Sequence, residues 1–198
     1  MLNKIIKNFI KNGYFDTLSN ISIDNSDKDN PISFFQSNKK YIDFDGEVIK
    51  NIFKDKQLKG CDLLTCKNNI IYLIEFKNST RMKLNKNKKT ELKQKASESW
   101  MIILKLLFDY NVSLNEFFQK YQIILIVIYK LPENSTGRIH EHLERKGDIN
   151  FGLERYQNFY HKIKYSSLLV PTRPIMKTWI LRSVLADFSG LQLSNHER

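Results

Sequence analysis

The sequence predicts an α/β protein in which helices flank a central mixed β-sheet, and three segments carry this prediction. Apolar residues at 61–66 and 70–76 are separated by a short polar stretch, which is the pattern of a β-hairpin. Residues 90–110 repeat apolar side chains at helical spacing. Residues 122–129 are apolar almost without interruption, as in a strand that is buried on both faces. A hairpin, a helix and a buried strand in this order indicate layers of helix and sheet.

The segments before the hairpin give weaker signals. Residues 2–10 have the apolar spacing of an amphipathic helix, and residues 20–38 are rich in Asn, Asp and Ser, as in a loop. Residues 41–44 alternate as a short strand does, whereas 47–53 fit either a helix or a strand.

The segments after the hairpin include two helix starts. Thr90 is a plausible N-cap for the long helix, and Ser113 begins a capping-box pattern for a short one. Beyond the buried strand we expect a loop at 132–147, a helix at 151–163, an edge strand at 166–170 and a last helix after Pro174.

Length and composition favour one domain over residues 1–198, with a core at 41–130 and a mainly helical C-terminal elaboration at 132–198. The 41% apolar and 12% aromatic content excludes a wholly disordered chain. Two cysteines cannot form a disulfide scaffold, and the longest apolar run is too short for a membrane-spanning helix. We therefore expect a cytoplasmic protein with no membrane partner.

The net charge of +11 is concentrated in one stretch. Residues 77–95 hold eight basic residues and one acidic residue, so a phosphate backbone is their natural counterpart. A solvated basic loop is the alternative. The residues expected to bind nucleic acid are Arg81, Lys83, Lys86, Lys88, Lys89, Lys93 and Lys95.

The hairpin brings acidic residues together. If the turn falls at Asn68-Asn69, Asp62 lies directly opposite Glu75, and Lys77 shares their face of the sheet. Two carboxylates side by side in an apolar setting repel each other. A divalent cation such as Mg²⁺ would compensate this repulsion, whereas an exposed Glu75–Lys77 ion pair is the purely structural alternative.

These residues resemble the motif of the PD-(D/E)xK nuclease superfamily, here Cys61-Asp62 followed by Glu75-Phe76-Lys77. The resemblance spans about 41–130 and implies a restriction-endonuclease-like core, which is a helix, a three-stranded meander, a helix and a further strand. It implies that Asp62 and Glu75 bind Mg²⁺, for which Mn²⁺ would substitute, and that Lys77 assists the attacking water. By the same resemblance Gln94 is a catalytic candidate on the following helix, and Glu47 is the candidate for an additional metal-binding acid.

The sequence therefore predicts a Mg²⁺-dependent phosphodiesterase, an endonuclease or exonuclease, with DNA favoured over RNA as substrate. A homodimer would suit cleavage of both strands of a duplex. Two alternatives remain open: a catalytically inactive nucleic-acid-binding module with the same fold, and a protein-interaction effector with an incidental basic loop.

Overall fold

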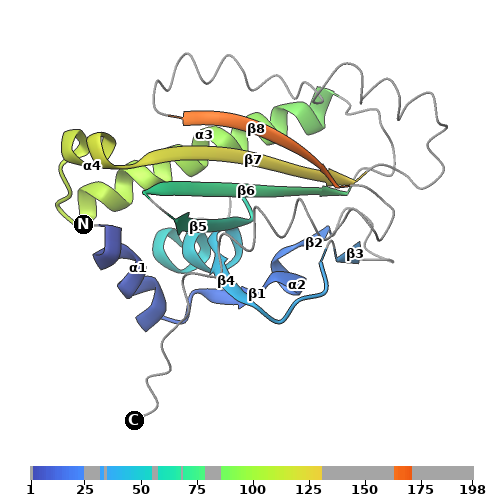
Figure 1. Cartoon of the computed structure of the whole chain (residues 1–198), viewed down its shortest axis with the longest axis horizontal. Helices are drawn as coiled ribbons and strands as arrows, with labels where there is room; N and C mark the ends of the chain where they lie inside the picture. The colour runs from blue at the N-terminus through green and yellow to red at the C-terminus, as the bar shows by residue number, and fades with distance from the viewer. Residues whose placement is uncertain are drawn as a thin grey trace, which may run out of the picture.

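A computed structural model describes residues 2–24, 32–33, 35–54, 58–67, 69–78, 86–130 and 163–170 of the chain. Within them a six-stranded sheet has the order β1-β4-β5-β6-β7-β8 (Figure 1). Its strands are β1 (Phe15–Thr17), β4 (Lys40–Asp43), β5 (Leu63–Lys67), β6 (Ile70–Asn78), β7 (Gln122–Lys130) and β8 (Ile163–Val170). A separate two-stranded sheet pairs β2 (Ile23–Asp24) with β3 (Ile32–Ser33).

The large sheet is mixed, as the sequence predicts. The pairs β1–β4, β4–β5 and β5–β6 are antiparallel, whereas β6, β7 and β8 run parallel to one another. A parallel connection needs a crossover, and α3 (Lys86–Asp109) lies between β6 and β7 in the chain. The α/β class is therefore confirmed.

The β5–β6 hairpin has the predicted register. Lys67 pairs with Ile70, and the ladder continues to Leu63 opposite Ile74. Asn69 adopts a φ of 62°, a left-handed conformation that asparagine tolerates better than most residues. The two-residue turn thus fixes which side chains of the two strands face each other.

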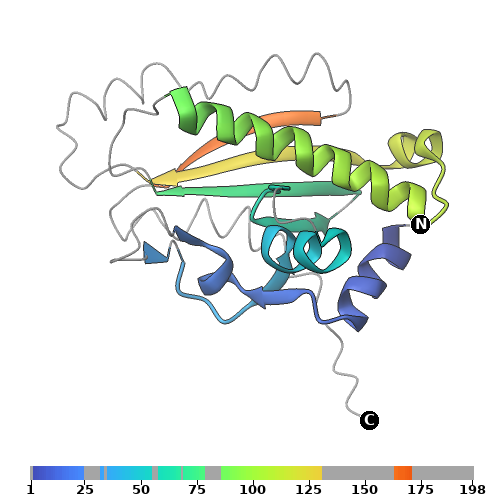
Figure 2. The ribbon, with the colours of Figure 1, turned by 180° about the vertical axis from the view of Figure 1, so that it is seen from behind.

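Helices cover one face of the sheet (Figure 2). These helices are α1 (Leu2–Lys11), the π-helix η1 (Phe44–Phe53), α3 and α4 (Leu114–Lys120). The short helix α2 (Leu18–Ile21) follows β1 and packs on the opposite face. The helix at 2–10 and the short helix after Ser113 are confirmed, and the Ser113 hydroxyl accepts from the Glu116 N–H. The undecided segment at 47–53 belongs to η1.

Strand β6 divides the core into two parts. Ile71 and Leu73 belong to the larger part, which the helices α1, η1, α3 and α4 share with the sheet. Ile74 and Phe76 belong to the smaller part on the opposite face, with residues of α2. Because side chains alternate along a strand, Glu75 takes the same face as Ile71 and Leu73 and points toward the helices.

Three expectations need correction. The expected loop at 20–38 contains the end of α2 and both short strands β2 and β3, whose local pairing its polar composition did not reveal. Helix α3 begins at Lys86, so Thr90 lies inside the helix instead of capping it. The helix expected at 151–163 meets strand β8 at its last residue, because Ile163 pairs with Ile123.

The expected edge strand at 166–170 is confirmed as part of β8. The loop at 132–147, the helix expected from 151 to 162 and the last helix after Pro174 lie outside the described residues. Among the residues that are described, no helix combines the length and apolar character needed to cross a bilayer.

The carboxylate of Asp43 links the end of β4 to the start of η1. It accepts a 2.8 Å hydrogen bond from the Gly46 N–H as the N-cap of that helix. Burial raises the pKa of Asp43 to about 6 against the effect of this hydrogen bond, and the charges of Glu47, Asp16 and Asp45 add to the rise.

We predict that replacing Asp43 with Asn flattens the pH dependence of stability between about pH 4 and pH 6. The unfolded chain ionises Asp43 at its ordinary pKa while the folded protein retains the proton, so wild-type stability falls as the pH rises through this window. Asparagine keeps the cap and cannot ionise, so Asp43→Asn should gain about 1–2 kcal/mol at pH 7. Urea unfolding from pH 4 to 7 measures this, with Asp109→Asn as control, and an unchanged slope contradicts it.

Candidate active site

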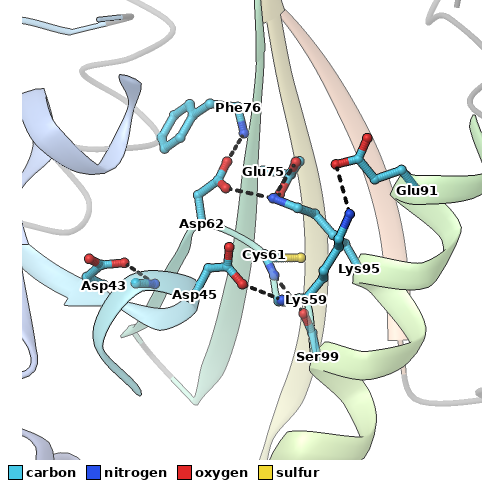
Figure 3. A network of polar contacts seen from close by, with 12 residues as sticks. Asp43, Asp45, Lys59, Cys61, Asp62, Glu75, Phe76, Glu91, Lys95 and Ser99 are labelled. Carbon is cyan, nitrogen blue, oxygen red and sulfur yellow. Dashed lines mark hydrogen bonds and ion pairs between the residues drawn. The ribbon is translucent and has the colours of Figure 1, made fainter. Parts of the chain in front are cut away.

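The two predicted acids meet at the open end of the β5–β6 hairpin (Figure 3). Asp62 immediately precedes β5, and Glu75 lies in β6 with no exposed surface. The Phe76 N–H donates a 2.7 Å hydrogen bond to Asp62 Oδ2. A side-chain carboxylate therefore takes over where the backbone ladder between the strands ends at Leu63 and Ile74.

A lysine of α3 joins both acids. Lys95 Nζ lies 2.9 Å from Asp62 Oδ1 and 3.0 Å and 3.1 Å from the two carboxylate oxygens of Glu75. Lys95 is only 8% exposed. Its place in the basic stretch 77–95 predicts a lysine that binds nucleic acid, whereas the structure places it in the buried site. The buried stripe of α3 explains this position, because Lys95 falls between Leu92 and Ser99 on the side that faces the sheet.

Side chains hold the backbone that leads into Asp62. Each N–H from 59 to 61 donates to a side-chain oxygen of η1 or α3: Lys59 to Glu98 Oε2 at 2.5 Å, Gly60 to Asp45 Oδ1 at 2.7 Å, and Cys61 to Ser99 Oγ at 2.8 Å. We call residues 59–62 the acid-bearing segment. Side chains of α3 and η1 thus hold its backbone N–H groups, and the Asp62 carbonyl accepts a 3.1 Å hydrogen bond from the Phe44 N–H.

Gly60 allows this close approach of the acid-bearing segment to η1. A Cβ atom at residue 60 would overlap the side chain of Ile49 and lie 3.1 Å from the ring of Phe44. Both of these residues are buried, so they have little room to move. Glycine therefore lets the residue 60 N–H reach Asp45.

Burial and charge together shift the pKa values of the described acids and of the lysine in this site. Burial and the charge of Glu75 raise the pKa of Asp62 to about 7, although Lys95 and the Phe76 N–H favour its ionised form. Burial also raises the pKa of Asp45, and Glu75 adds to that rise. Burial alone would lower the pKa of Lys95, but Glu75, Asp62 and Asp45 hold it well above its ordinary value, so Lys95 is charged.

The acid of η1 that acts on this cluster is Asp45, two residues before the predicted Glu47. The charge of Asp45 helps to raise the pKa of Lys95, and the charge of Glu75 in turn helps to raise the pKa of Asp45. The carboxylate of Glu47 instead accepts a 2.9 Å hydrogen bond from Asn51 on its own helix. Sequence reasoning missed Asp45 because it left the type of this element undecided, so it could not assign a face to either acid.

Gln94 also points elsewhere. It is exposed on α3, and its side-chain amide donates a 2.8 Å hydrogen bond to Glu98 Oε1. Glu98 in turn accepts from the Lys59 N–H, so Gln94 supports the acid-bearing segment through Glu98. The structure therefore does not bring Gln94 to the two acids.

The basic residues are described only in part. Lys77 belongs to β6, but its side chain is outside the described part of the chain. The same holds for the side chains of Lys86, Lys88 and Lys89 in the first turn of α3, and Arg81 and Lys83 lie wholly outside it. Lys93 is half-buried on α3. Their contact with nucleic acid stays a prediction.

The carboxylates of Asp62 and Glu75 are the described groups of this site that converge on one cation. Within the described residues no group of three or more His, Cys, Asp or Glu side chains is arranged to hold a metal ion. Mg²⁺ commonly takes one or two carboxylates and completes its shell with water and phosphate oxygens. Asp62 and Glu75, converging on one cation, provide that minimal set.

Comparisons of the chain with protein-family models, curated proteins and solved structures give no match.

We predict that Ser99→Ala destabilises the protein by about 1–3 kcal/mol, because it leaves the buried Cys61 N–H without an acceptor. The control is Ser97→Ala on the same helix. Ser97 donates only to the Lys93 carbonyl, so its loss should change the free energy of unfolding by less than about 0.5 kcal/mol. Urea unfolding of both variants measures the difference, and equal effects would show that the acid-bearing segment does not depend on Ser99.

Proposed function

We propose that the protein is a metal-dependent nuclease that hydrolyses phosphodiester bonds of DNA or RNA at the Asp62–Glu75 pair. In this proposal the two carboxylates hold Mg²⁺, or Mn²⁺ in its place, and Lys77 assists the attacking water. The bound ion would polarise the phosphoryl group and lower the pKa of a water molecule.

The buried negative charge of the site carries this proposal. Among the described side chains, Asp45, Asp62 and Glu75 contribute three negative charges when ionised. Lys95 contributes one positive charge, and the charge of Lys59 also acts on Asp45. Burying ions costs several kcal/mol each, and their attraction repays this only when charges are paired and hydrogen-bonded. Among the described side chains, Lys95 is the cation that contacts Asp62 and Glu75, and a divalent cation at these two carboxylates would reduce the cost of burying them further. Strongly perturbed pKa values in such a cluster favour a functional site.

The order of the elements supports the proposed core. The antiparallel strands β4, β5 and β6 form a meander, α3 follows, and β7 returns parallel to β6. This is the order of meander, helix and further strand that the resemblance to PD-(D/E)xK nucleases implies. The helix η1 differs, because it lies between β4 and β5 and brings Asp45 to the site from inside the meander.

The lysines give the proposal its substrate class. Lys77 follows Glu75 by two positions on β6, as the Glu75-Phe76-Lys77 motif requires. The net charge of residues 77–95 reaches +7, and this stretch runs from the motif into α3. A phosphate backbone is the natural partner for such a stretch, and DNA is our first choice.

We expect metal-dependent cleavage by the wild type that falls by about 10²-fold or more in Glu75→Gln. The substitution keeps the size of the side chain and removes the charge that would hold the metal. The assay uses labelled single- and double-stranded DNA and RNA with Mg²⁺, with Mn²⁺ and with EDTA, and the exposed Glu116→Gln is the control. Equal cleavage by Glu75→Gln and wild type would refute the assigned site.

A second candidate function is nucleic-acid binding without catalysis. The observation that favours it is that Lys95 already contacts both acids, as the partner in an ion cluster would. This candidate predicts no cleavage with either metal. It also predicts a binding constant that falls steeply as salt rises, because lysines bound to phosphates release counterions.

A further inference from the structure

We propose that Lys95 is a displaceable counter-ion: its ammonium group occupies the place between Asp62 and Glu75 that a divalent cation takes, and the two cations compete for it. The inference rests on the proposed function, because it assumes that these two carboxylates hold the metal. It assigns to Lys95 the role of a positioning residue that sets the affinity for metal.

The geometry makes the two cations mutually exclusive at this position. The ammonium nitrogen contacts three carboxylate oxygens, one of Asp62 and two of Glu75, all within 3.1 Å. Mg²⁺ approaches its oxygen ligands to about 2.0–2.1 Å. An ion bound by the same oxygens would therefore lie in contact with the Lys95 ammonium in a buried site, where repulsion between cations is strong.

The environment allows Lys95 to leave. Lys95 belongs to the long helix α3. Its flexible four-carbon side chain can change rotamer and move the ammonium group away from the two carboxylates. Asp45 of η1, which also accepts from the Gly60 N–H, supplies an additional negative charge that acts on Lys95. Asp62 is also 20% exposed, so an ion can reach the pair from solvent.

The pair needs a cation in the absence of metal. Glu75 has no exposed surface, and its carboxylate is held between strands and helix beside Asp62. Among the described side chains, Lys95 is the cation in contact with both carboxylates, so its removal would leave their mutual repulsion less compensated. In the metal-free protein, Lys95 thus compensates the charges of Asp62 and Glu75, and a bound divalent cation would take over this role.

The experiment is a titration of the full chain with Mn²⁺ by calorimetry, without nucleic acid. Lys95→Met keeps the length of the side chain and removes its charge, and we expect it to bind Mn²⁺ at least tenfold more tightly, which equals about 1.4 kcal/mol. We expect its metal-free melting temperature to fall and Mn²⁺ to restore it. The matched control is Lys105→Met on the same helix, where Lys105 is exposed and pairs with Asp109, and its affinity should equal that of the wild type.

Two further variants keep the test decisive. Lys95→Arg retains the charge and should bind Mn²⁺ no more tightly than the wild type. Adding Glu75→Gln to Lys95→Met should abolish the gain. If Lys95→Met is unfolded without metal, Mn²⁺ should refold it, as followed by circular dichroism. A Lys95→Met affinity equal to or weaker than that of the wild type, or failure of Mn²⁺ to refold an unfolded variant, overturns the inference.

The outcomes separate this inference from the proposed function. Cleavage by the wild type without a gain in Mn²⁺ affinity in Lys95→Met would refute the competition and leave the nuclease intact. A gain in affinity that depends on Glu75, with no cleavage of any substrate, would support the competition and refute the nuclease.

Discussion

The buried carboxylate of Glu75 is the constraint on which the rest of the site depends. It lies on the central strand β6, beneath helices that pack against the larger part of the core. An ionised group there costs several kcal/mol unless a partner compensates it. Lys95 of α3 is that partner, so the crossover helix must place this residue over β6 as well as bury its own apolar stripe. The ion pair between Glu75 and Lys95 thereby constrains the position of α3 relative to β6.

Asp62 also depends on α3, because side chains of this helix accept hydrogen bonds from the backbone that leads into Asp62. Asp62 follows three residues, 59–61, whose backbone N–H groups donate to side chains, where a strand would donate to its neighbour. Fixed side-chain acceptors on η1 and α3 hold this segment without making it part of the sheet. The carboxylate of Asp62, one residue before β5, accepts hydrogen bonds from the Phe76 N–H and the Lys95 ammonium. A site assembled this way remains close to solvent on the Asp62 side and closed on the Glu75 side.

Local sequence patterns were sufficient for the hairpin and insufficient for its partners. The register predicted from the short polar stretch is confirmed from Lys67–Ile70 to Leu63–Ile74. One residue beyond this ladder, hydrogen bonds from the Phe76 N–H and the Lys95 ammonium hold the Asp62 carboxylate near Glu75. Lys95 and Asp45 come from elements distant in the chain, whose orientation depends on tertiary packing. The sequence nevertheless holds a signal for Lys95, since it lies three residues after Leu92 and directly before Ala96, both of which α3 buries. Its membership of a basic run obscured that signal, because a charge run is read as a surface.

The placement of Lys95 inside the protein changes the meaning of the net charge. The chain carries an excess of +11, yet its described interior contains a cluster in which acids outnumber the lysine. A phosphodiester attracted by the basic stretch would meet carboxylates at the end of β6, and like charges would repel there. A divalent cation removes this conflict by binding carboxylate and phosphate oxygens together. In the proposed nuclease the metal is therefore required for the substrate to approach the acids at all, before it contributes to the chemical step.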